Sequence, residues 1–329
     1  MEMHKIFTAA RVWPRRMWLG TKCPYRTTSR PRQRHGSFST TQAILTSQSV
    51  GSQGQKLTLE ADTEKFRTHS VQDLLSLKGR VTIVTGGARG IGLALARGTA
   101  ELGSDVAVLD ILEKPSDAFH DFQKELGVRA KYYRTSVTDP TTLARTFEQV
   151  VSDFGRIDNC VTAAGIVVDK PFLETTAEEG TNVLEVNVMG TYLSAQLAAR
   201  QMQVQNSGGS IVMIASIAAR SALPAQHLSI YGASKGAVKG LCRQLSVELS
   251  PLKIRVNTIS PGYISTEMTS RLAVTNPTLL SVFNSAAPLQ RIGDRADLKT
   301  VVAYLCSEAA AYTTGTDILV TGGLHAGRL

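Results

Sequence analysis

The chain has 329 residues, of which 43% are hydrophobic, so it can bury a large single core. Its formal net charge is +9, but residues 1–50 hold nine Lys or Arg residues against one acid, which leaves the remainder almost neutral. A nearly neutral body argues against nucleic acid as a partner, and no apolar run approaches the ~18 residues of a membrane span.

Residues 1–54 have the composition of a mitochondrial transit peptide, because they are rich in Arg, Ser and Thr and poor in acids. A helix there would gather four apolar residues on one stripe, although Pro14 interrupts it. We expect this segment to be disordered, to direct import into the matrix, and to be cleaved between His35 and Gln55. The alternative is a basic disordered tail on a cytoplasmic protein.

From Arg80 onward, short apolar runs alternate with helical patterns, which is typical of a parallel sheet. The apolar runs predict strands at 81–85, 105–110, 130–137, 159–163, 210–215, 253–259 and 317–320. Amphipathic patterns predict a helix after the first strand and others at 116–126, 140–154, 176–204, 228–250 and 294–310. The sequence therefore predicts an α/β fold. Residues 79–329 would form a single doubly wound Rossmann-type domain with a mostly parallel sheet, preceded by an N-terminal extension over 55–78.

A glycine-rich turn lies between the first predicted strand and the first predicted helix. It has the spacing Gly86-x-x-x-Gly90-x-Gly92. Glycines at such a turn allow the backbone to approach a pyrophosphate, whose charge the helix N-terminus favours. The strand before the turn and the helix after it are the context that a dinucleotide-binding motif requires.

Two charged residues near this turn give opposing indications about the cofactor. Asp110 ends the second predicted strand, where an acid accepts hydrogen bonds from the adenosine ribose and repels a 2′-phosphate. Arg89 favours the opposite choice, because a guanidinium there can pair with a 2′-phosphate. We give Asp110 more weight and expect NAD, with NADP as the alternative.

The sequence contains a candidate acid–base pair in the segment Tyr231-Gly232-Ala233-Ser234-Lys235. On a helix, residues four apart lie on one face, so the phenol of Tyr231 and the ammonium of Lys235 are neighbours. A nearby cation favours the phenolate and lowers the pKa of the tyrosine towards working pH. The pair is thus a candidate proton donor and acceptor.

Several motifs in this order resemble the short-chain dehydrogenase/reductase family over about residues 75–325. They are the glycine turn, Ala163-Ala164-Gly165, Asn187, Ser216, Tyr231-x-x-x-Lys235 and Pro261-Gly262. The resemblance implies an oxidoreductase that moves hydride between a nicotinamide cofactor and an alcohol or ketone. It also implies a homotetramer, with the helices near 176–204 and 228–250 at the interfaces.

The resemblance further implies a role for each motif residue. Tyr231 would exchange a proton with the substrate oxygen, Lys235 would hold the nicotinamide ribose, and Ser216 would hydrogen-bond the same substrate oxygen. Asn187 would link Lys235 to solvent through a water. The residues expected to contact the cofactor are Gly86, Arg89, Gly90, Ile91, Gly92, Asp110, Val137, Ala163, Ala164, Gly165, Asn187, Tyr231, Lys235, Pro261, Gly262, Ile264 and Thr266.

Two positions depart from the family pattern. The usual Asn before Ala-Gly is Ala163, and the usual Asp that contacts adenine before Val137 is Ser136. The first departure is expected to loosen the turn over the cofactor, and the second to weaken adenine recognition. Both departures are expected to affect affinity for the cofactor, and neither lies in the acid–base group.

Within the family, two stretches are similar to fungal polyol and ketose enzymes such as arabinitol 2-dehydrogenase, mannitol 2-dehydrogenase and sorbose reductase. They are Leu75–Arg80 and Val161–Ile166. The segment from about Glu267 to Pro288 is expected to cover a small-molecule substrate. Its polar residues suit a polyhydroxylated one: Thr266, Thr269, Ser270, Arg271, Asn276 and Asn284.

Two other functions remain as alternatives. An NADPH-linked 3-oxoacyl carrier-protein reductase is favoured by Arg89 and the leader, but Asp110 and the neutral body oppose it. A catalytically silent dinucleotide-binding sensor has no need of a proton donor, whereas all four catalytic positions are filled here. No metal is expected, because the four cysteines lack ligand spacing.

Overall fold

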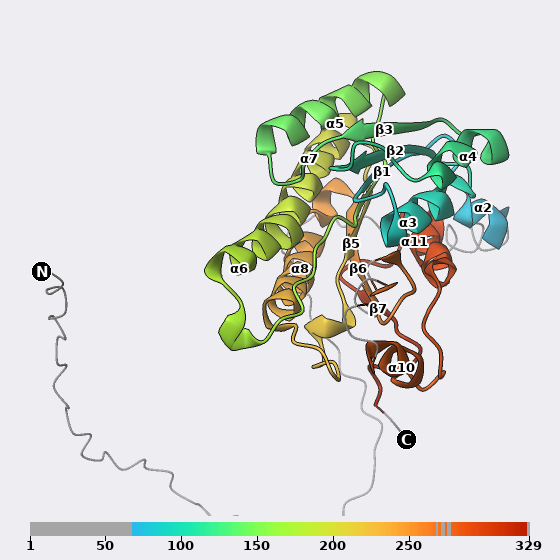
Figure 1. The fold of residues 1–329 in the computed structure, drawn as a ribbon. Helices are drawn as coiled ribbons and strands as arrows, with labels where there is room; N and C mark the ends of the chain where they lie inside the picture. Colours follow the sequence, from blue (N-terminus) through green and yellow to red (C-terminus); the bar gives the residue numbers. More distant parts are fainter. Residues whose placement is uncertain (1–67, 268, 271–273, 275–277, 328–329) are drawn as a thin grey trace, which may run out of the picture. The chain divides into compact units, whose positions relative to one another are not determined.

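The computed structural model describes residues 68–267, 269–270, 274 and 278–327. Its strands form one seven-stranded sheet in the order β3-β2-β1-β4-β5-β6-β7, and every neighbouring pair is parallel (Figure 1). The strands are β1 Val81–Thr85, β2 Asp105–Asp110, β3 Ala130–Arg134, β4 Asn159–Thr162, β5 Gly209–Ile214, β6 Ile254–Pro261 and β7 Asp317–Val320. The predicted doubly wound Rossmann-type domain is confirmed, and its sheet is parallel throughout.

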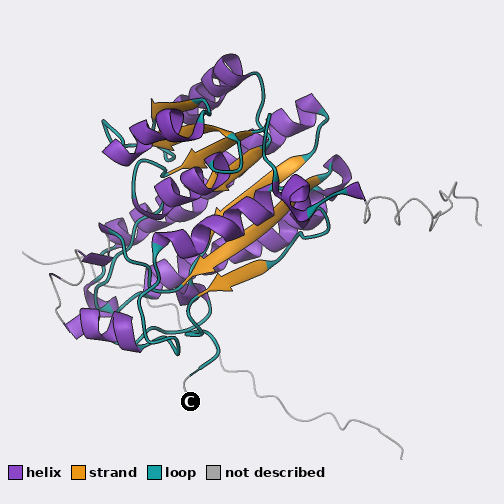
Figure 2. Cartoon of the chain, turned by 90° about the vertical axis from the view of Figure 1, so that its right-hand side faces the viewer, coloured by secondary structure: helices purple, strands orange, loops and turns teal. Residues whose placement is uncertain are grey.

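Helices cover both faces of this sheet (Figure 2). Side chains of α5, α7 and α8 share one buried cluster with one face, and side chains of α3, α4 and α11 share a second cluster with the other. The helices are α2 Val71–Leu75, α3 Gly90–Ala100, α4 Asp117–Leu126, α5 Pro140–Phe154, α6 Ala177–Leu184, α7 Gly190–Gln205, α8 Ser229–Glu248, α10 Thr278–Ser285 and α11 Lys299–Cys306.

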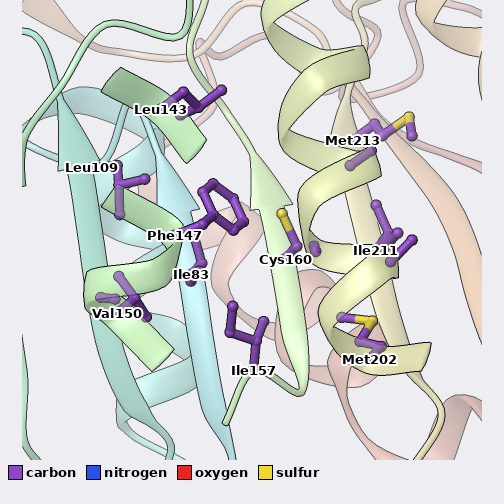
Figure 3. Close-up of a cluster of buried hydrophobic side chains, with 14 of the residues drawn as sticks. Ile83, Leu109, Leu143, Phe147, Val150, Ile157, Cys160, Met202, Ile211 and Met213 are labelled. Atoms are coloured by element: carbon purple, nitrogen blue, oxygen red, sulfur yellow. The ribbon is translucent and has the colours of Figure 1, made fainter. Parts of the chain in front are cut away.

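The first of these clusters shows why the strands are apolar along their whole length. Leu143, Phe147 and Val150 of α5 face Ile83 and Leu109 of the sheet (Figure 3), and all five are buried. All residues of β1 are buried, as expected for a central parallel strand covered on both faces. The packing therefore holds the carboxyl ends of the strands in fixed positions, and the candidate site lies at those ends.

Local signals fix the ends of the helices that carry this packing. Asp139 caps α5 by accepting hydrogen bonds from the amides of Thr141 and Thr142, and Pro140 occupies its first turn. Gly155 ends the same helix at φ +84°, in the left-handed region. These signals explain why the predicted bounds of this helix agree with the structure.

Elsewhere the bounds differ from the prediction. The third strand ends at Arg134, and residues 135–138 form a loop instead. The helix predicted over 176–204 is divided by a π-helical turn over Glu185–Met189. The helix predicted over 294–310 contains α11 between two short 3₁₀ turns. Helix α10 lies within the segment expected to be a covering loop.

The residues just before the predicted domain contact its core. Leu77 is fully buried, and its amide donates a hydrogen bond to the carbonyl of Leu102 at 2.9 Å. The predicted transit peptide, residues 1–54, lies outside the described residues. Within the described part of the chain, no helix is long and apolar enough to cross a membrane.

Candidate active site

The carboxyl ends of the strands surround a cavity of about 760 Å³. It lies where β1 and β4 are neighbours, which is the point where the order of the strands reverses. All the predicted site residues line it except Asn187. The fold thus brings together residues from strand ends and loops that are far apart in the sequence.

The glycine turn is shaped by close backbone contacts. Gly86 has φ +67°, and a Cβ on it would lie 2.5 Å from the Cα of Ala164. A Cβ on Gly92 would lie 2.1 Å from the carbonyl oxygen of Gly86. No side chain among the described residues caps the N-terminus of α3 at Arg89. An open helix N-terminus beside a turn that excludes side chains fits the pyrophosphate of a dinucleotide.

Asp110 both lines the cavity and holds the turn. One carboxylate oxygen accepts from the amide of Ala88 at 3.0 Å, and the other accepts from Leu112 at 3.2 Å. The carboxylate is therefore fixed beside the turn. Arg89 lines the same cavity from an exposed position. The structural role of Asp110 was not expected from the sequence, which suggested only contact with the ribose.

Hydrogen bonds hold the two loops that depart from the family pattern. The amide of Ala163 donates to the carbonyl of Thr85 at 3.0 Å, which ties this turn to β1. The hydroxyls of Ser136 and Thr138 lie 2.8 Å apart, and Ser136 also accepts from the Thr138 amide. Both Ala163 and Ser136 line the cavity.

Tyr231 and Lys235 come from α8 and lie next to the end of β5. The ammonium of Lys235 donates to the carbonyl of Ile214 at 2.8 Å and lies 5.8 Å from the centre of the Tyr231 ring. Ser216 lies two residues after the end of that strand, and its hydroxyl is hydrogen-bonded to Tyr231. The structure thus brings the three side chains together.

The pKa of Tyr231 differs from the sequence-based expectation. Burial raises the pKa of this phenol, and the hydrogen bond from Ser216 opposes that shift only in part. Burial also lowers the pKa of Lys235 to about 8. Removal from water thus outweighs the expected attraction of the cation, because the same apolar surroundings disfavour both charged forms. The phenol keeps its proton near neutral pH and is a proton donor in this form.

Asn187 has a different environment from the one expected. It is fully buried, and its side-chain amide donates to the carbonyl of Ile166 and to the Ser234 hydroxyl, both at 3.0 Å. Its side-chain oxygen accepts from the amide of Ile166 at 2.9 Å. The π-helical turn directs Asn187 inward, where it holds the loop after β4 against α8. The predicted relay through water to Lys235 stays a prediction.

Asn187 and Lys235 nevertheless lie on the same side of Gly165. A Cβ on Gly165 would lie 3.3 Å from the side-chain oxygen of Asn187 and 3.5 Å from the ammonium of Lys235. Ser234, which the sequence analysis did not single out, links Asn187 to α8 and donates to the carbonyl of Tyr231 at 2.7 Å. Its position inside the Tyr-Gly-Ala-Ser-Lys segment was the only available signal.

In its described residues, the wall expected to bind a substrate combines polar and apolar side chains. Thr266 and Thr269 line the cavity, but helix α10 contributes the buried Phe283. Ser270 and Asn284 are exposed and are not among the described lining residues, while Arg271 and Asn276 lie outside the described residues. Of the described residues of this segment, Glu267 and Thr269 therefore bring polar groups to the cavity, and Ser270 and Asn284 do not.

Further polar lining groups come from two segments for which no role was predicted. Asn182 comes from α6, and Gln226 from the loop between β5 and α8. Nothing in the sequence distinguishes either from an ordinary surface residue. Within the described ranges, no group of three or more His, Cys, Asp or Glu side chains can hold a metal ion.

Comparisons with known proteins agree with this geometry. Residues 86–325 match a family model described as enoyl-(acyl carrier protein) reductase. An NADP-dependent mannitol dehydrogenase from Hypocrea jecorina is 36% identical over 255 residues, covering 76% of this chain and 94% of the relative. A sorbose reductase from Candida albicans is 35% identical over 257 residues, covering 77% and 90%.

Two further matches extend the range of relatives. A 3-oxoacyl-[acyl-carrier-protein] reductase from Aquifex aeolicus is 33% identical and covers 76% of this chain and 99% of the relative. The crystal structure of a short-chain type dehydrogenase/reductase from Mycobacterium marinum superposes with a TM-score of 0.74 at 37% identity, covering 78% and 100%. The chain belongs to the short-chain dehydrogenase/reductase family. It is a nicotinamide-dependent oxidoreductase that acts on CH–OH groups.

Proposed function

We propose that the enzyme interconverts a sugar alcohol and the corresponding ketose, with Tyr231 as the general acid and base. The observation that carries the proposal is the shared cavity. One wall is the glycine turn that fits a pyrophosphate, and the other holds Tyr231, Ser216 and Lys235. The similarity to a mannitol dehydrogenase and a sorbose reductase supports the substrate class.

Tyr231, Ser216 and Lys235 have separate roles in the proposed reaction. A nicotinamide dinucleotide supplies the ring that gives or takes hydride. Tyr231 gives its proton to the carbonyl oxygen during reduction and takes the hydroxyl proton during oxidation. Ser216 donates a hydrogen bond to the same oxygen and stabilises the charge that develops there. Lys235, held by the carbonyl of Ile214, is positioned to orient the ribose next to the phenol.

We favour NAD over NADP because of the fixed carboxylate of Asp110. The amides of Ala88 and Leu112 hold it at the cavity wall, so a 2′-phosphate would lie next to a negative charge in a fixed position. Arg89 is exposed, and ordering its long side chain costs entropy before it can pair with a phosphate. The NADP-dependent fungal relatives provide the reason to measure this preference directly.

The second candidate is a 3-oxoacyl carrier-protein reductase. A bacterial relative with that activity and the description of the matching family favour it. The apolar wall formed by Phe283, Leu223 and Val186 would also suit an acyl chain. A silent sensor is less favoured, because Tyr231, Ser216 and Lys235 are arranged as an acid–base group.

One assay distinguishes these candidates. Protein lacking residues 1–54 is mixed with NAD(H) or NADP(H) and with polyols, ketoses or 3-oxoacyl thioesters, and absorbance at the nicotinamide band is followed. The proposal expects the highest kcat/KM with a polyol or ketose. Higher kcat/KM with the thioesters supports the second candidate, and no turnover with any substrate supports the sensor.

Location and assembly are further parts of the proposal. The basic, acid-poor segment 1–50 supports import into mitochondria, and family resemblance supports a homotetramer. A reporter fused to residues 1–50 should enter mitochondria, and the triple replacement of Arg11, Arg15 and Arg16 by Glu should prevent entry. A cytosolic signal from the unmodified fusion contradicts import. Light scattering of the purified protein measures the assembly, and a monomeric mass contradicts the tetramer.

A further inference from the structure

Gln226 combines a fixed hydrogen bond with a buried acceptor that has no partner among the described residues. It lines the cavity that also holds Tyr231. Its side-chain nitrogen donates to a carboxylate oxygen of Asp169 at 3.2 Å, while its Oε1 is buried and unpaired in the described part of the chain. An unsatisfied buried acceptor is unfavourable, so a donor from outside the protein would stabilise it.

The orientation of this amide is set by its surroundings. The side chain of Asp169 is only 12% exposed, and its other oxygen accepts from the amide of His227 at 2.7 Å. The amide of Lys170 in turn donates to the carbonyl of His227 at 3.1 Å. Turning the amide of Gln226 over would place its oxygen against the carboxylate. The nitrogen therefore faces Asp169, and the oxygen is kept as the free acceptor.

The loop that carries Gln226 is strained next to this acceptor. Ala225 has φ +59°, which is in the left-handed region that residues with a Cβ adopt at a cost. Because Oε1 is shielded from solvent, a ligand reaches it only through a small rotation of the side chain or shift of the loop. Binding a donor would satisfy the acceptor, and this gain can offset the cost of that adjustment.

The surrounding wall limits what the donor can be. Leu223, Leu228, Val186 and Phe283 line the same cavity and offer no hydrogen-bonding side-chain groups, whereas Asn182, Thr266 and Thr269 line it with polar ones. A polar group placed on an apolar wall selects the position of a ligand hydroxyl and disfavours ligands that lack it. We propose that Gln226 Oε1 accepts a hydrogen bond from a substrate hydroxyl other than the reacting one, and so selects polyhydroxylated substrates over simple alcohols and ketones. This inference rests on the proposed function.

The test compares the wild-type enzyme with Gln226→Met, which keeps a similar volume and removes the acceptor. The substrates are the best polyol or ketose from the assay above, its monodeoxy analogues, and 2-butanone or 2-butanol. We expect kcat/KM for the parent substrate to fall at least about ten-fold, because its hydroxyl is then buried without a hydrogen-bond acceptor. We expect less than about a two-fold change with 2-butanone or 2-butanol, because they place no hydroxyl there.

The deoxy analogues separate binding of a hydroxyl from a structural role. In the wild-type enzyme one analogue should be about ten-fold poorer than its parent, and in Gln226→Met the two should be equal. Gln203→Met, at an exposed position of α7, is the matched control and should behave as wild type. If Gln226→Met does not fold, Asp169→Asn tests the same point, because it frees the amide to turn and should weaken the discrimination.

The outcomes distinguish this inference from the function on which it rests. A wild-type enzyme that turns over no polyol or ketose overturns the proposed function and this inference together. Turnover by the wild type, with equal losses for all substrates in Gln226→Met, overturns the role of Gln226 alone. Unchanged discrimination among deoxy analogues in the variant does the same.

Discussion

The two halves of the cavity are built differently. The dinucleotide half, at the ends of β1, β2 and β4, is shaped by backbone: a Cβ on Gly92 would lie 2.1 Å from a carbonyl oxygen. The substrate half is shaped by side chains on loops and on α10, including Gln226 and Phe283. A backbone-defined site demands particular residue types at fixed spacing, so its sequence identifies it. A side-chain-defined site tolerates many sequences and leaves no comparable signal.

Tyr231→Phe should separate chemistry from dinucleotide binding and gives the largest expected effect. The ionisable oxygen is lost while the backbone of the glycine turn is untouched, so turnover should fall by about 10²–10⁴-fold. The Kd for the dinucleotide should change little. Steady-state rates and fluorescence titration measure the two effects, with Tyr192→Phe on α7 as the control. Turnover by Tyr231→Phe at the wild-type rate would contradict the proposed mechanism.

Lys235 is buried next to the end of β5, and its burial makes the stability of the protein depend on pH. Burial lowers its pKa to about 8 in the folded enzyme, whereas the unfolded value is near 10.4. Between these values the unfolded chain holds the proton and the folded chain does not, so the free energy of unfolding rises with pH. Over this pH range the free energy of unfolding rises by about 3 kcal/mol, at 1.36 kcal/mol per pKa unit.

Lys235→Met removes this contribution and provides the comparison. The variant also loses the hydrogen bond to the carbonyl of Ile214, which lowers its stability by a separate amount. The expected result is therefore the pH dependence: the stability of the variant relative to the wild type should be highest near pH 7 and should fall as pH rises through 8 towards 10. Urea unfolding of both proteins at several pH values measures the difference. A difference that is independent of pH, or that grows with pH, contradicts the lowered pKa.

Gly92→Ala should damage the dinucleotide half alone. The added methyl overlaps the carbonyl of Gly86, and relieving such overpacking typically costs about 1–3 kcal/mol. We expect a lower Tm and a Kd for the dinucleotide raised about ten-fold, which is 1.4 kcal/mol. Gly240→Ala on α8 is the control, because a Cβ there meets no atom of the described chain within 4 Å. Equal behaviour of the two variants would show that the turn is not sterically restricted.

The smallest expected effect concerns the choice of cofactor. We expect a higher kcat/KM with NAD than with NADP in the wild-type enzyme. Asp110→Ser should narrow or invert that ratio, because it removes the repulsion of a 2′-phosphate and leaves Arg89 to pair with it. Arg89→Ala should affect NADP more than NAD. A wild-type preference for NADP that persists in Asp110→Ser would show that Arg89 outweighs Asp110.

The sequence alone determined the fold class and the residues of the candidate site. Alternating apolar runs and helical patterns predicted the seven strands, because each element carries its own periodicity and end signals. Gly86, Gly92, Tyr231 and Lys235 were recognised because their spacing is set within one turn or one helix. These residues line one cavity because the carboxyl ends of parallel strands lie at the same edge of the sheet.

Tertiary structure decided what depends on contacts between distant segments. Burial, and not the nearby cation, sets the direction of the pKa shift of Tyr231. The π-helical turn directs Asn187 inward to Ile166 and Ser234, although its sequence continues a helical pattern. Gln226 gained its free acceptor only because the fold placed Asp169 beside it. Desolvation and hydrogen-bond partners are properties of the packed chain, and no local pattern encodes them.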